Sequence, residues 1–152
     1  MAYPTILFSA DGEQFNTYRD DGTGVQFPYG TQLVLQDGRK FRFVRNGATL
    51  AVSGDVMQAG LNTANHVNLT AIAAAAGSRA PTATLGATAA TVNDYREGYA
   101  IVEVTPDGGS TYVIGSHAAV LSAGVITMNL APGFSVQRAW TTTSRVGLVR
   151  NP

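Results

Sequence analysis

Short stretches of alternating apolar and polar residues, separated by turn residues, run through most of this chain. The clearest lies at residues 40–44, where Phe41 and Phe43 would face one side of a strand and the basic residues between them the other. Asp-Gly and Asn-Gly pairs, which favour the positive φ angles of tight turns, stand on either side of it. These turn residues are Asp37, Gly38, Asn46 and Gly47. The pattern predicts a three-stranded meander from about residue 31 to residue 52.

The rest of the chain predicts further strands at 67–76, 80–85, 99–104, 110–116, 125–130, 134–139 and 145–150. The segment 67–76 is also compatible with a short alanine-rich helix, although Thr70 and Ile72 favour a strand. Asp107 and Gly108 form a strong turn signal between two of the strands. A single helical turn is predicted at 91–95. Strands at this spacing predict an all-β fold, an antiparallel β-sandwich or small β-barrel.

Residues 1–29 have a different composition, because turn residues interrupt every apolar run. Aromatic side chains are nevertheless spaced through this segment: Tyr3, Phe8, Phe15, Tyr18, Phe27 and Tyr29. We expect an extended N-terminal arm that either anchors on a neighbouring subunit through these aromatics or folds back onto its own domain. The predicted division is therefore an arm at 1–29 and a β-domain at 30–152, with 30–60 as a meander leading into the main barrel or sandwich.

Charged residues make up only 13% of the 152 residues, and ten basic side chains balance ten acidic ones. A nucleic-acid-binding protein normally has a basic surplus, so that class is not expected. The longest apolar block, 69–76, is too short to span a membrane. No signal-peptide pattern opens the sequence, which predicts synthesis in a cytoplasm. So few charges leave a surface poorly protected against association, which is typical either of an assembly subunit or of a low-charge β-protein.

Candidate catalytic and metal-binding residues are sparse. Asp94 and Glu97 lie three residues apart, yet nothing in the sequence places them across a substrate. His66 has no metal-ligand partner at a suitable spacing, so it is expected to be a structural histidine with satisfied hydrogen bonds. His117 is expected to be a surface or capped histidine. The absence of cysteine removes thiolate chemistry. The sequence therefore predicts no enzyme, no metal site and no cofactor.

A family resemblance rests on several motifs: DGRKFRFVRNG at 37–47, GDVMQA at 54–59, NHVNL at 65–69 and VGLVRNP at 146–152. TLGATAAT at 84–91, YREGYAIVEV at 95–104 and TYVIGSH at 111–117 extend it, so that it covers roughly residues 30–152. In these motifs the chain resembles a family of tailed-phage head decoration, or capsid cement, proteins of the marine siphophage and cyanophage type. The first 29 residues fall outside the resemblance.

The resemblance implies a structural virion protein, made in the cytoplasm of a bacterial host, that binds the outer surface of the major capsid protein shell and stabilises the mature head. By analogy with other head decoration proteins we expect a homotrimer. Exposed-looking aromatic and basic residues are the candidate contacts: the six arm aromatics with Arg39, Arg42 and Trp140. The alternative is a β-sandwich module that binds a glycan or a host surface, with Trp140 and Tyr112 or Tyr99 as the stacking platform.

Overall fold

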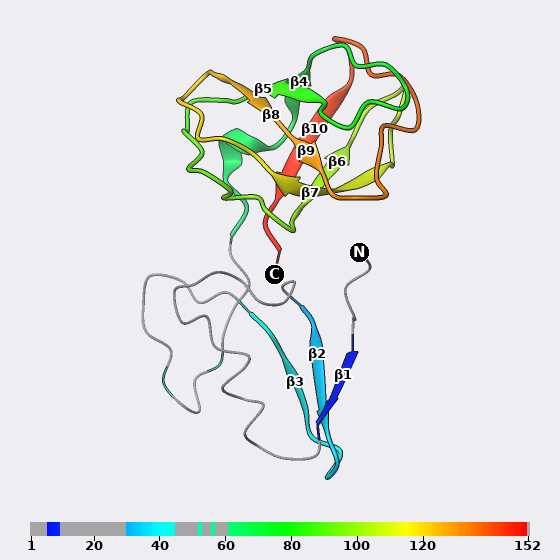
Figure 1. Ribbon diagram of the computed structural model, residues 1–152. Helices are drawn as coiled ribbons and strands as arrows, with labels where there is room; N and C mark the ends of the chain where they lie inside the picture. The colour runs from blue at the N-terminus through cyan, green and yellow to red at the C-terminus, as the bar shows by residue number, and fades with distance from the viewer. Residues whose placement is uncertain (1–5, 10–29, 45–51, 53–55, 57–60, 152) are drawn as a thin grey trace. The chain divides into compact units, whose positions relative to one another are not determined.

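The computed structural model describes residues 6–9, 30–44, 52, 56 and 61–151 (Figure 1). The chain divides into two compact units, Met1–Gln58 with Pro152 and Ala59–Asn151. All the regular elements in the described residues are β-strands, apart from one turn of 3-10 helix, so the predicted all-β class is confirmed. No helix in the described ranges is long and apolar enough to cross a membrane.

The first unit contains a three-stranded sheet of β1 (Ile6–Ser9), β2 (Gln32–Leu35) and β3 (Lys40–Arg42). β2 pairs antiparallel with β3, whereas β1 lies parallel to β2 on its other side. One strand of the expected arm therefore belongs to the same sheet as the meander, and the predicted boundary between residues 29 and 30 stays a prediction. The third meander strand and the turn at Asn46 and Gly47 fall outside the described residues.

The turn between β2 and β3 is the predicted one. Gly38 has a φ of 85°, and its amide donates to the Leu35 carbonyl at 3.0 Å. The Asp37 carboxylate accepts a hydrogen bond from the Arg39 amide at 3.0 Å, the usual role of Asp in such a turn. Leu33, Leu35 and Phe43 are buried in this unit.

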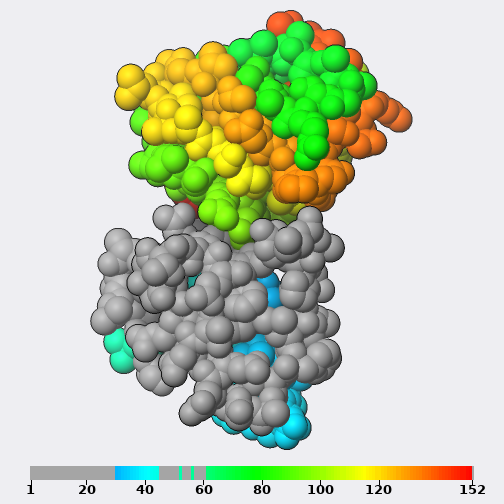
Figure 2. Space-filling model, viewed as in Figure 1, coloured from blue at the N-terminus to red at the C-terminus, as the bar shows by residue number. Residues whose placement is uncertain are grey.

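The second unit contains β4 (Leu69–Ala71), β5 (Thr82–Thr84), β6 (Tyr99–Val102), β7 (Thr111–Ser116), β8 (Val125–Thr127), β9 (Asn129–Leu130) and β10 (Arg145–Val149), with a 3-10 turn η1 at Ala64–His66. The strand order is β8-β5-β4-β10-β6-β7-β9, and every pairing is antiparallel. In the space-filling view the atoms of this unit lie close together across the face shown (Figure 2).

This sheet closes into a barrel. β8 and β9 stand at opposite ends of the strand order, yet only Met128 separates them in the chain. The Met128 amide donates to the Pro81 carbonyl on the β5 side, and the Ala131 amide donates to the Val113 carbonyl on β7. One extended run therefore pairs with β5 along one edge and β7 along the other. Of the two predicted architectures, the small barrel is the one observed.

The inward positions of the barrel strands form the core. Cross-strand neighbours such as Val102 and Val146, Ala100 and Leu148, and Ala83 and Ile126 all point inward and are almost fully buried. The small alanines lie opposite larger side chains, an alternation that suits the interior of a narrow barrel. Tyr95, in the turns before β6, and Trp140, in the segment before β10, belong to the same core cluster.

Three local predictions are wrong. Residues 134–139 form no strand. The Gly77 amide donates to the Val136 carbonyl, the Val136 amide donates to the Ser78 carbonyl, and the Val136 side chain belongs to the core. Residues 91–95 form consecutive turns instead of helix, because Asn93 takes a left-handed φ of 57°. In 67–76 only Leu69–Ala71 is a strand, after which the chain turns.

Candidate functional site

The predicted contact residues differ in how far the structure describes them. Phe8 lies in β1, whereas Tyr3, Phe15, Tyr18, Phe27 and Tyr29 fall outside the described residues. Arg39 is exposed and pairs with Asp37, with 2.6 Å between guanidinium nitrogen and carboxylate oxygen. Hydrogen bonds from the Arg39 backbone amide and then from its guanidinium hold the pKa of Asp37 below its usual value. Arg42 donates to the Gly30 carbonyl at 2.9 Å, across the sheet.

Trp140 is buried, with 2% of its surface exposed. The expectation that it is an exposed contact residue or a stacking platform is therefore wrong. Tyr112, its proposed companion in a glycan platform, is also 2% exposed. Their indole and phenol rings pack against each other with centroids 6.0 Å apart. Both side chains instead serve a polar network at one end of the barrel.

Asp107 is the centre of this network. Its carboxylate, 2% exposed, accepts hydrogen bonds from the Ser110 hydroxyl at 2.7 Å, the Tyr112 hydroxyl at 2.5 Å and the Trp140 indole N–H at 2.9 Å. The Tyr112 hydroxyl in turn accepts from the Gln137 amide at 2.8 Å. Burial, and then the hydrogen bond to the Asp107 carboxylate, raise the pKa of Tyr112. The network ties the β6–β7 turn to the segment before β10.

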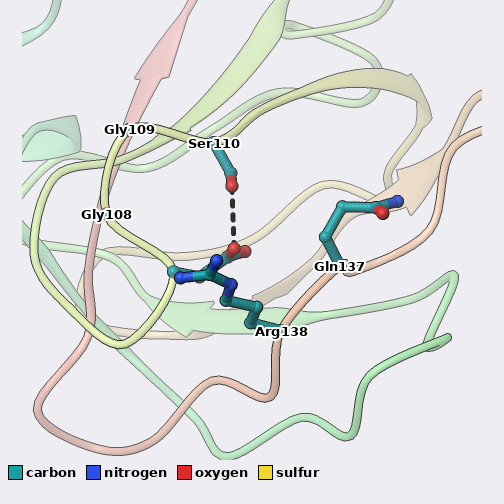
Figure 3. Close-up of a pocket in the computed structure, with 6 residues that line it drawn as sticks. Gly108, Gly109, Ser110, Gln137 and Arg138 are labelled. Carbon is teal, nitrogen blue, oxygen red and sulfur yellow. Dashed lines mark hydrogen bonds between the residues drawn. The ribbon is translucent and has the colours of Figure 1, made fainter.

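A polar pocket of about 550 Å³ opens beside this network and is lined by Asp107, Gly108, Gly109, Ser110, Gln137 and Arg138 (Figure 3). The first four residues come from the β6–β7 turn, and the last two from the segment 131–144. In Figure 3 the Arg138 side chain extends from its own segment toward the turn that carries Gly108, Gly109 and Ser110. The turn signal at Asp107 and Gly108 marked one wall in the sequence. Nothing in the sequence marked Gln137 or Arg138, since they approach only through the fold.

A second polar network lies at the other end of the barrel, around Tyr95. The Tyr95 hydroxyl shares a hydrogen bond with His66 Nδ1, and the Tyr95 amide donates to His117 Nε2 at 3.0 Å. The remaining ring nitrogens donate to carbonyl groups, His66 Nε2 to Thr88 at 2.8 Å and His117 Nδ1 to Ala118 at 2.8 Å. The partners therefore place a proton on Nε2 of His66 and on Nδ1 of His117, so the two rings carry it on different nitrogens.

His66 is thus the structural histidine that the sequence predicted. His117 is 2% exposed, so the surface alternative is wrong. Both of its ring nitrogens have hydrogen-bond partners, which agrees with the capped alternative. Burial raises the pKa of Tyr95. No group of three or more His, Asp or Glu side chains in the described residues is arranged to hold a metal ion.

Asp94 belongs to the same end of the barrel. The Arg150 guanidinium donates to both of its carboxylate oxygens, with nitrogen–oxygen distances of 3.1 and 2.8 Å. The guanidinium carbon also lies 5.4 Å from the centre of the Tyr95 ring. The hydrogen bonds to Asp94 raise the pKa of Arg150. Asp94 therefore forms a two-point salt bridge that links the turns before β6 to the end of β10.

The outward positions of β4, β5 and β8 and of Ile72 beside them carry no charged residue. The strand registers place Thr70, Thr84 and Val125 in one row and Ile72, Thr82 and Thr127 in the next. We call these six residues the threonine face. Val125 is 50% exposed and Ile72 38% exposed. Charged residues are normally depleted at the centres of protein interfaces, so this composition suits contact with another protein.

Comparison with known proteins identifies no relative: no family model, curated protein or solved structure matches the chain.

Proposed function

We propose that this protein is a phage head decoration protein that binds the outside of the major capsid protein shell and stabilises the mature head. The sequence motifs that resemble the decoration family support the proposal. The observation on which it rests most in the structure is the threonine face, an uncharged surface on a rigid closed barrel. Such a surface lacks the exposed charge that normally opposes association with another protein.

Stabilisation of the shell would come from apolar area buried between neighbouring capsomers. The gain is about 25 cal/mol per Å² of apolar surface removed from water. Each association also costs roughly 4–15 kcal/mol in lost translational and rotational freedom. A single small contact therefore gives weak binding, whereas several linked copies bind by avidity. This is why we propose a homotrimer, in which three copies of the face engage one site of the capsid together.

Co-sedimentation with expanded heads that lack the protein tests the proposal. We expect the full chain to bind stoichiometrically and to saturate. Thr127→Lys, which places a charge in the threonine face, should weaken binding at least about tenfold, since an unpaired charge buried in an interface costs several kcal/mol. The matched control is Thr142→Lys, an equally ordinary exposed threonine in the segment before β10. Equal binding by both variants would remove the threonine face from the contact.

A truncation that lacks residues 1–29 separates the two parts of the hypothesis. Loss of binding would locate the anchor in the first unit, from which the truncation also removes β1, whereas retained binding would locate it in the rest of the chain. Failure of the full chain to bind any head would refute the decoration function. Sedimentation equilibrium of the free protein tests the trimer independently, and a monomer at micromolar concentration would count against it.

The alternative, a glycan-binding module, loses the stacking platform on which it was based, because Trp140 and Tyr112 are buried. What remains in its favour is the polar pocket.

A further inference from the structure

The pocket beside Asp107 has a wall without side chains. Gly109 has a φ of 91°, which L-residues with side chains rarely adopt, and a Cβ at Gly108 would lie 3.2 Å from the Thr105 amide nitrogen. Both positions are exposed. A ligand can therefore approach the backbone of this turn closely, as glycines often allow. No hydrogen bond among the described residues uses the Gly108 amide.

The floor of the pocket can only accept hydrogen bonds. Ser110 has one hydroxyl proton, and it goes to the Asp107 carboxylate because a carboxylate cannot donate. The Ser110 oxygen therefore offers only lone pairs to a ligand. Asp107 receives three hydrogen bonds, of which a single one reaches Oδ1, so this oxygen keeps accepting capacity.

The opposite wall mainly donates. Arg138 is exposed and makes no ion pair or hydrogen bond with any of the residues that the structure describes, so its fork of five N–H groups is free. Gln137 uses one amide proton on the Ser135 carbonyl at 3.0 Å and keeps both a second N–H and its carbonyl oxygen.

This arrangement selects a class of ligand. The charges of the Asp107 carboxylate and the Arg138 guanidinium cancel, so the pocket has no net charge. Arg138 would attract an anion that Asp107 repels, and Asp107 would attract a cation that Arg138 repels. A hydroxyl group both donates and accepts, and two adjacent hydroxyls can bridge an accepting floor and a donating wall. We propose that this pocket is a binding site for a neutral saccharide, held through neighbouring hydroxyls by Arg138, Gln137, Ser110 and the Gly108 backbone. The proposal is independent of whether the protein coats a capsid.

The affinity of the site should be low. Tyr112 and Trp140 are buried and donate their hydrogen bonds to Asp107, so neither presents an aromatic face to a sugar ring in the pocket. Hydrogen bonds exchanged with water contribute about 1 kcal/mol each on balance. A ligand held by three or four of them binds with a Kd on the order of millimolar.

The test is an NMR titration of the full-length ¹⁵N-labelled protein with D-glucose, D-galactose, D-mannose and N-acetyl-D-glucosamine, and separately with sodium acetate. We expect at least one sugar to shift the amides of Gly108, Gly109 and Ser110 saturably, at millimolar concentration, while acetate does not. Arg138→Ala should weaken this binding by about tenfold, the usual effect of losing a charge-assisted hydrogen bond. Arg79→Ala is the matched control, since Arg79 is also exposed and unpaired among the described residues.

Three outcomes would overturn the proposal: no saturable shift with any of the sugars, saturation by acetate at the same amides, which would make the pocket an anion site, or unchanged sugar affinity in Arg138→Ala. Arg138→Lys keeps the charge without the planar fork and should bind more weakly than the native protein. Because Arg138 is exposed, the spectra of both variants should otherwise superpose on the native spectrum, which distinguishes a binding defect from misfolding.

Discussion

Replacing Asp107 by alanine should destabilise the barrel more than any substitution of an exposed residue. The change removes the acceptor for three donors at once, and two of them, the Tyr112 hydroxyl and the Trp140 indole N–H, belong to side chains that are 2% exposed. Neither can reach water without disturbing the core. The Ser110 hydroxyl is only partly buried and can turn toward the pocket.

The magnitude follows from these two orphaned groups. Each buried donor without a partner costs about 1–3 kcal/mol, so we expect Asp107→Ala to lower the free energy of unfolding by about 3–5 kcal/mol. Asp107→Asn keeps one oxygen, which can stay at the Trp140 side while the new amide faces Ser110, whose hydroxyl can then accept. The asparagine variant should therefore lose only about 1–2 kcal/mol.

Urea unfolding followed by fluorescence measures both variants, because Trp140 is the single tryptophan and reports on this unit alone. With a slope of about 2 kcal/mol per M, the alanine variant should shift the midpoint downward by about 2 M. Asp37→Ala, which removes an exposed carboxylate in the other unit, is the control and should leave the midpoint unchanged. A loss below about 1 kcal/mol for Asp107→Ala would refute the reasoning that buried donors depend on this carboxylate.

Three other predictions follow from the second unit. The raised pKa of Tyr112 means that its stabilising contribution is complete below pH of about 10 and is lost as pH rises through the higher folded value, so Tyr112→Phe should flatten the alkaline end of an unfolding curve measured against pH. Gly98→Ala should cost at least about 2–3 kcal/mol in thermal unfolding, because its Cβ would lie 2.2 Å from a backbone carbonyl of β10, whereas Gly77→Ala, strained only by its φ of 86°, should cost about 1 kcal/mol. Long-range ¹H–¹⁵N NMR should find His66 protonated at Nε2 and His117 at Nδ1, and the same tautomer at both would contradict their hydrogen bonds.

The strand pattern could be predicted where alternation and turn chemistry agree. The hairpin around Asp37 and Gly38, and the strands that became β5, β6, β7 and β10, each combine both signals. Residues 134–139 have the alternation but no neighbouring strand to pair with. The segment forms isolated backbone hydrogen bonds with residues 77 and 78, and these do not continue into a β-ladder. Whether an extended stretch becomes a strand depends on what lies beside it, and local sequence does not contain that information.

The functional residues were harder to predict for the same reason. The polar threonine run after Trp140 favours an exposed side chain. The indole is instead buried, where it donates a hydrogen bond to the carboxylate of Asp107, 33 residues away in the chain. Arg138 has no local signal at all, since an isolated arginine between small and polar residues is typical of any surface. Only the closed barrel brings the two segments together.

Closure also explains why polar networks gather where they do. A small barrel has no sheet edges, so the groups that need partners are those of the connections at its two ends. At the Tyr95 end, both ring nitrogens of each imidazole form hydrogen bonds, and the Arg150 guanidinium is paired with Asp94. These side chains therefore have structural roles. At the Asp107 end, the buried donors of the network all have a hydrogen-bond partner. The pocket beside it is lined by Arg138, whose guanidinium has no partner among the described residues. The described residues at the Asp107 end therefore offer unused hydrogen-bonding capacity to a ligand.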